Sequence, residues 1–254
     1  MMEKIQKYQF LFSELVKRDF KQKYKRTSLG MLWSILSPLL NLLVMRMVFT
    51  VFFAKDMEHY TTYLFSGLLV FNYFSESTKG GMSSLMANAK IFTKVNVPKY
   101  LFLLSKNVSA LINFGLTLGI YFLFCLIDGV SFGPHMLTLV FPVICMVIFN
   151  IGVGMVLSAL FVFFRDIQYL YDVFMTLLRY LSAIFYTVDR FGNYQNLFLL
   201  NPVYTYIRYF RLVVLEHTIP SLSYHLLCIF YAAIMLGIGC WFYKKYNHQF
   251  LYYV

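Results

Sequence analysis

The sequence has 254 residues, of which 60% are hydrophobic and 13% are charged, and its formal net charge is +11. Soluble globular domains carry about 25% charged residues, so this composition excludes an ordinary soluble domain and indicates an integral membrane protein. All four cysteines fall inside apolar runs, which argues against a fold built on disulfides.

The first 28 residues predict an amphipathic helix. Apolar side chains recur at helical spacing from Ile5 to Phe20, and most charged side chains lie elsewhere on the helical wheel. Such a helix is expected to lie along the cytoplasmic membrane interface. A passive topological anchor and a helix that guards the cytoplasmic entrance of a transport pathway both fit this pattern.

Six apolar runs follow this segment. They are Met31–Phe53, Tyr60–Ser77, Tyr100–Ile127, Met136–Phe164, Ile167–Val188 and Leu222–Tyr243. A helix that crosses the hydrocarbon core needs about 20 mostly apolar residues, and each run reaches or nearly reaches this length. We therefore predict an all-α membrane protein with six transmembrane helices in a single domain, residues 1–254.

The basic residues predict the orientation of these helices. They are concentrated before the first run, between the second and third, and after the sixth, whereas Ala54–His59 and Asp128–His135 are poor in basic residues. Loops rich in Lys and Arg stay in the cytoplasm, so both termini are expected there. We interpret the positive charge as a determinant of membrane orientation and as a partner for lipid headgroups, and not as a nucleic-acid-binding surface.

The segment Asp189–Ser221 has too few residues to cross the membrane twice, yet much of it is apolar. Pro202, Arg208, Arg211 and Glu216 argue against a lipid-facing helix. Short re-entrant or interfacial helices fit better, because irregular backbone at membrane depth must face protein or water. A structured outer loop is the alternative.

Motifs for catalysis are not found in the sequence. It contains no phosphate-binding Gly-x-x-x-x-Gly-Lys loop, no Gly-x-Ser-x-Gly elbow and no metal-type histidine pair. We therefore expect no enzymatic activity, no metal and no cofactor in this chain.

Two arginines fall within apolar runs, Arg46 in the first and Arg179 in the fifth. A charged side chain at membrane depth faces a partner or a water-filled path. One hypothesis is that both line a path for a phosphate-bearing substrate, because guanidinium matches phosphate in a bidentate fork. The alternative is snorkelling, or pairing with an acid such as Glu76, Asp172 or Asp189. The aromatic residues assigned to the same path are Trp33, Phe74 and Tyr180.

Several stretches resemble one family, the membrane subunit of ABC exporters for polysaccharides, O-antigens and teichoic acids. The first is residues 24–39, which read YKRTSLGMLWSILSPL. Four further landmarks match in order: residues 65–74 in the second run, the segment from Asn88 to Pro98, the Arg165-Asp166 turn and Asn201-Pro202. Val97, where the family has an aromatic residue, and the charged Arg46 depart from its pattern.

The resemblance implies a homodimeric permease that works with two copies of a separate ATP-binding subunit, which would hold ATP and Mg²⁺. It also implies two short re-entrant helices before the last span and a cytoplasmic coupling helix over Ser83–Pro98. The residues assigned to ATPase coupling are Asn88, Lys90, Ile91, Lys94, Val97, Pro98, Arg165 and Asp166.

The expected cargo is a cell-surface polysaccharide or teichoic acid linked to undecaprenyl diphosphate, exported across the bacterial cytoplasmic membrane. We assign Lys21, Lys23, Lys25 and Arg26 to the reception of its diphosphate. An ABC exporter of small amphiphiles or lipids is the main alternative, followed by a secondary transporter or a membrane-embedded transferase.

Overall fold

The computed structural model describes residues 2–25, 27–53, 59–95, 97–247, 249–251 and 253. The elements in this part of the chain are all helical, as predicted, and no strand occurs among them. In chain order they are α1 (Met2–Tyr24), η1 (Gly30–Leu32), α2 (Trp33–Phe53), α3 (Tyr60–Ala87), α4 (Ala89–Phe92), α5 (Tyr100–Ile127), η3 (Pro134–Leu139), α6 (Val140–Phe163), α7 (Ile167–Leu181), η4 (Val188–Leu200), α8 (Pro202–Val214), α9 (Leu222–Tyr246) and η5 (Gln249–Leu251), where η marks a 3-10 helix.

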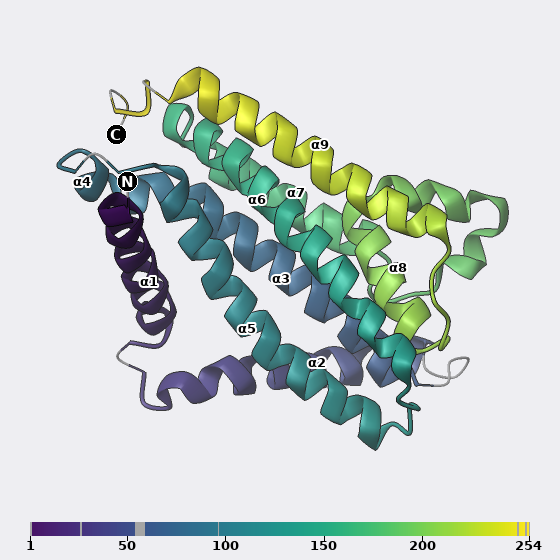
Figure 1. Ribbon diagram of the computed structural model, residues 1–254. Coiled ribbons are helices and arrows are strands. Elements are labelled where there is room, and N and C mark those ends of the chain that lie inside the picture. The colour runs from purple at the N-terminus through teal and green to yellow at the C-terminus, as the bar shows by residue number, and fades with distance from the viewer. Residues whose placement is uncertain are drawn as a thin grey trace.

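The centre of the molecule is α3, which packs against α5, α6 and α8 (Figure 1). Most of its residues are buried, from Tyr60 to Leu85. Aromatic side chains fill much of the contact with α5: the Phe65 ring centre lies 5.5 Å from that of Tyr121 and 5.6 Å from that of Phe124. The helix around which the bundle is built is therefore surrounded by protein.

Glycines allow α6 and α9 to approach closely. A Cβ atom on Gly152 would lie 2.4 Å from the carbonyl carbon of Met235, and one on Gly239 would lie 2.8 Å from the Gly152 carbonyl oxygen. Small residues permit such backbone approach between membrane helices, where packing rather than the hydrophobic effect holds helices together. These glycines account for the long side-by-side course of α6 and α9 in Figure 1.

Within the described part of the chain, four helical segments are long and apolar enough to cross a membrane. They are Gly30–Val48, Tyr100–Ile127, Pro134–Phe163 and Leu222–Tyr246. They coincide with the first, third, fourth and sixth predicted spans. Helix length and composition thus support these four spans.

The helices at the second and fifth predicted spans differ from the prediction. α3 continues past Ser77 to Ala87 and carries Glu76 and Lys79, so it is less apolar than the others. α7 ends at Leu181 rather than at Val188, and its 15 residues extend over only about 22 Å. The backbone leaves the helix here because Ala183 adopts a left-handed conformation, with φ of 46°.

The region Asp189–Ser221 contains two helical elements, η4 and α8. The carboxamide of Asn201 caps α8 by accepting a hydrogen bond from the Val203 amide at 3.0 Å, and Pro202 occupies the first turn, where its missing N–H costs nothing. α8 packs against α3, α6, α9, η3 and η4. It is enclosed by protein, as expected for a helix that carries Arg211.

The N-terminus, the C-terminus and α4 lie at one end of the bundle (Figure 1). The end of α6 belongs to the same group, because the Phe163 ring centre is 5.3 Å from that of Tyr246 and 6.0 Å from that of Phe250. α8 lies toward the opposite end (Figure 1). Both termini, α4 and the end of α6 therefore lie together, away from α8.

Candidate functional site

The segment assigned to coupling, Ser83–Pro98, is not one continuous helix. Its first residues form the end of α3, Asn88 interrupts the helix with φ of −114° and ψ of 13°, and α4 has only four residues. The Asn88 carboxamide donates to the Ser84 carbonyl at 2.8 Å, which closes the end of α3 in place of a continuing backbone ladder. The predicted coupling helix is thus a helix end, a break and a single turn.

The side chains assigned to coupling divide into buried and exposed groups. Asn88 and Val97 are buried, and Ile91 and Pro98 are half-buried. The exposed group consists of Lys90, Lys94, Arg165 and Asp166. The Arg165 guanidinium lies 5.7 Å from the Phe161 ring centre. Asp166 occupies the N-cap position of α7 but its side chain makes no cap hydrogen bond, so its contribution to the helix is limited to the favourable charge at the helix N-terminus.

A buried carboxylate fastens α1 to the helices beside it. Asp19 accepts hydrogen bonds from Arg18 at 2.8 Å and Ser105 at 3.0 Å, and pairs with Lys106 at 3.0 Å. Arg18 also donates to the Asn88 carboxamide at 2.8 Å. This network therefore connects α1 with α5 and with the break before α4. Sequence analysis missed it, although an acid within a basic amphipathic helix was a visible signal.

Lys99 connects the segment after α4 with the C-terminal residues. Its ammonium donates to the backbone carbonyl of Asn247 and to the Asn247 carboxamide oxygen at 3.2 Å. It also lies 5.9 Å from the Phe92 ring centre and 5.4 Å from that of Phe250. Burial lowers the pKa of this ammonium. The termini and α4 thus form one connected unit.

The five side chains assigned to a substrate path are not brought together within one copy of the chain. Arg46 is exposed on α2, and its guanidinium has no hydrogen bond or ion pair in the described structure. Arg179 on α7 is half-buried and lies 5.1 Å from the Phe71 ring centre. Trp33 and Tyr180 are exposed, whereas Phe74 is buried against the Phe149 ring, 5.9 Å away. Phe74 therefore belongs to the core.

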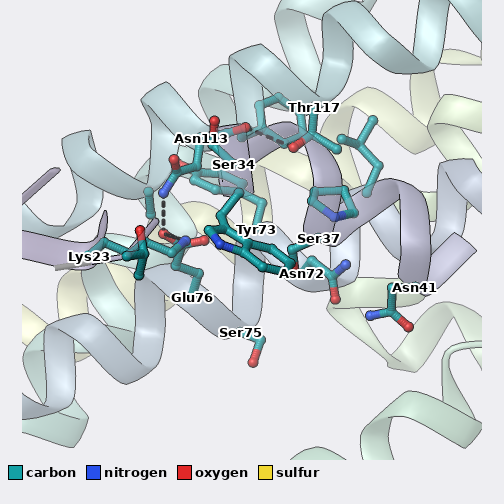
Figure 2. Close-up of a pocket in the computed structure, with 16 residues that line it drawn as sticks. Lys23, Ser34, Ser37, Asn41, Asn72, Tyr73, Ser75, Glu76, Asn113 and Thr117 are labelled. Atoms are coloured by element: carbon teal, nitrogen blue, oxygen red, sulfur yellow. Dashed lines mark hydrogen bonds and ion pairs between the residues drawn. The ribbon is translucent and has the colours of Figure 1, made fainter. Parts of the chain in front are cut away.

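A cavity of about 510 Å³, with a lining of mixed polar and apolar side chains, lies between the end of α1 and the helices α2, α3 and α5. Figure 2 shows its polar lining. These side chains are Lys23, Ser34, Ser37, Asn41, Asn72, Tyr73, Ser75, Glu76, Asn113 and Thr117. Its volume is within the range of small-molecule pockets, about 300–1,000 Å³. Sequence analysis did not find this cavity, because its residues are spread over four helices.

One end of the cavity holds an ion pair. Lys23 Nζ donates to Glu76 Oε1 at 2.8 Å, and the Asn113 carboxamide donates to the same oxygen at 2.6 Å (Figure 2). Lys23, which was assigned to the diphosphate, is thus already paired with a carboxylate. Lys21 and Lys25 are exposed. Arg26, and most of the Ala54–His59 loop, lie outside the described residues.

Arg211 on α8 is the largest fully buried side chain, with 2% of its surface exposed. Its guanidinium donates to the Tyr63 hydroxyl at 2.7 Å, the Ala183 carbonyl at 2.9 Å and the Ile184 carbonyl at 3.1 Å. Its central carbon is 3.4 Å from the Tyr63 ring centre. No carboxylate of the described residues pairs with it. Its partners follow the C-terminus of α7, where the helix dipole favours a cation, so Arg211 joins α3, α7 and α8.

Comparison with known proteins identifies the family of this chain. The family described as "ABC-2 type transporter" matches residues 10–215. An O-antigen export system permease protein, RfbA, from Myxococcus xanthus is 28% identical over 228 residues, which cover 87% of this chain and 86% of that protein. Two proteins of the same name from Klebsiella pneumoniae are 28% and 27% identical over 249 residues, and each match covers 95% of both chains. The family resemblance seen in the sequence motifs is confirmed, and the chain belongs to the ABC-2 type transporter family.

Proposed function

We propose that the chain is the permease subunit of an ATP-driven exporter that moves a cell-surface polysaccharide, linked to undecaprenyl diphosphate, across the bacterial cytoplasmic membrane. The observation that carries this proposal is the family match over residues 10–215, together with relatives named as O-antigen export permeases that align over nearly their whole length. A separate subunit would bind and hydrolyse ATP with Mg²⁺, and this chain would provide the path. Teichoic acid, a polyol phosphate polymer, is the alternative cargo for the same path.

A six-span topology is compatible with the two helices that are short or polar. α3 is surrounded by protein along most of its length, and its two charges are paired, Glu76 with Lys23 at 2.8 Å and Lys79 with Asp172 at 2.6 Å. This pairing reduces their cost at membrane depth. α7 would cross together with the turn that follows it. α8 would be a re-entrant helix, since it is enclosed by protein at the end opposite both termini (Figure 1).

Coupling to the ATPase would take place at the end that holds α4 and both termini, placed in the cytoplasm by the positive-inside rule. Lys90 and Lys94 are exposed there, and the Arg165-Asp166 turn provides a second exposed charged site. Movement of α4 would reach α1 through Asn88 and the Arg18–Asp19 network. The ATPase would thus move α1 and the transmembrane helices together through its contact with α4.

Two apolar helix faces would meet in a homodimer. α2 has only 11% of its spanning window buried, and α7 exposes large apolar side chains such as Leu170, Val173 and Leu177. Large exposed apolar surfaces indicate contact with lipid or protein. With α2 and α7 lining the path between two copies, Arg46 and Arg179 would face a phosphate-bearing substrate and Trp33 and Tyr180 its sugars.

The decisive experiment uses the purified complex of this chain with its ATPase. ATP turnover should rise on addition of an undecaprenyl-diphosphate-linked glycan and stay at its basal rate with small amphiphilic drugs. The opposite pattern would indicate an exporter of small amphiphiles, and recovery of the chain without any ATPase would point to a different class of transporter.

A second experiment tests the arginine path. Replacing both Arg46 and Arg179 by Gln should lower export while the ATPase still co-purifies. Normal export by this double variant would refute the assignment of these arginines to the path.

A further inference from the structure

Two of the carboxamides that line the cavity form no hydrogen bond with any described residue. Asn41 lies near the middle of α2 and Asn72 near the middle of α3, and neither side chain forms a hydrogen bond within the described structure. Both line the cavity, as do Ser37 and Ser75 (Figure 2). Unpaired amides at membrane depth cost free energy unless water or a polar ligand satisfies them. Their position in one hollow indicates a hydrated binding site.

The cavity is electrically balanced. Lys23 and Glu76 are the charged side chains in its described lining, and they pair at 2.8 Å. Asn113 holds the same carboxylate oxygen of Glu76 at 2.6 Å, which keeps this pair in place. A diphosphate or a polyol phosphate would therefore meet no uncompensated cation among the described lining residues, while its own desolvation cost would remain. The chemistry of the cavity suits a ligand that is polar but uncharged.

We propose that this cavity binds uncharged sugar residues of the exported polymer, so that the cargo is a neutral glycan rather than a polyol phosphate. This inference rests on the proposed function and adds the substrate class. Each carboxamide offers two donors and an acceptor with two lone pairs, a combination that matches neighbouring hydroxyl groups on one ring. Trp33, which is 36% exposed, and Phe114 contribute aromatic surface to the same lining.

The two tryptophans of the chain make this testable by fluorescence. Trp33 lines the cavity, whereas Trp241 is on α9 and does not. In a Trp241→Phe background, the full chain is purified in a detergent without a sugar headgroup and titrated with mannotriose, with a glycerol phosphate oligomer and with inorganic pyrophosphate. Mannotriose should change the Trp33 emission saturably, and the two anionic probes should not.

Substitutions of residues that line the cavity test whether mannotriose binds there. Asn72→Leu and Asn41→Leu should each weaken mannotriose binding about tenfold, the value of one or two hydrogen bonds. Asn196→Leu, a matched change at an exposed position in η4, should leave it unchanged. Because Asn41 is exposed, its replacement does not threaten folding, and elution as a single peak checks each variant.

The proposal is overturned if mannotriose leaves Trp33 unaffected, if the anionic probes bind wild type better than mannotriose does, or if both Asn variants bind it normally. These failures are separable from failure of the proposed function. A complex that is stimulated by lipid-linked glycan but has no mannotriose site in this cavity would retain the function and refute only this inference.

Discussion

Replacing Arg211 by methionine is expected to lower the free energy of unfolding by about 3 kcal/mol. The change removes donors at 2.7, 2.9 and 3.1 Å from the Tyr63 hydroxyl and from the Ala183 and Ile184 carbonyls. Buried acceptors left without a donor cost about 1–3 kcal/mol each. Relief of the burial of an uncompensated guanidinium offsets part of this loss, so the net effect is smaller than the sum.

The loss of stability is measured as a change in melting temperature. For a chain of this size, 1 kcal/mol shifts the melting temperature by about 2–4 °C, so Arg211→Met should melt about 6–12 °C below wild type. The readout is the monodisperse size-exclusion peak that survives heating in detergent. Arg208→Met is the matched control on the same helix: it loses only a partly exposed pair with Glu216, worth about 0–1 kcal/mol. Equal melting of wild type and Arg211→Met, or equal losses in both variants, would refute the reasoning.

Three further changes test packing, α1 attachment and coupling. Gly152→Ala should lower the free energy of unfolding by about 1–3 kcal/mol, because the new Cβ would lie 2.4 Å from the α9 backbone. Gly237 has open space around it, so Gly237→Ala should leave the melting temperature unchanged in the same assay. Asp19→Asn should speed amide hydrogen exchange in α1, because it weakens the contacts of α1 with α5. Glu14→Gln, which removes an exposed ion pair, should leave the exchange rate unchanged. Equal exchange rates in the two variants would show that Asp19 does not fasten α1. Lys94→Glu should reduce co-purification of the ATPase without changing the melting temperature, and full recovery of the ATPase would remove Lys94 from the interface.

The spans that depend on local composition could be predicted from the sequence. α2, α5, α6 and α9 are long apolar helices in which intrahelical hydrogen bonds satisfy the backbone, so their existence follows from run length alone. The amphipathic pattern of α1 is equally local. The second apolar run ends at Ser77, whereas α3 continues to Ala87. Composition predicts only the apolar part of this helix, and the charges Glu76 and Lys79 are paired with Lys23 and Asp172 by tertiary contacts.

The sites depend on contacts between residues far apart in the chain. Asp19 meets Lys106, Lys23 meets Glu76 and Arg211 reaches Tyr63, and no local pattern encodes such pairs. Arg46 and Arg179 stand out in the sequence as charges within apolar runs, yet Arg211 is the arginine that is buried among those whose burial the structure describes. The apolar helices, their membrane environment and the family could thus be inferred from composition and short motifs, because these features are local. The pairing of the polar groups, and the exposure of others to a cavity, follow from how the helices pack, which no local pattern encodes.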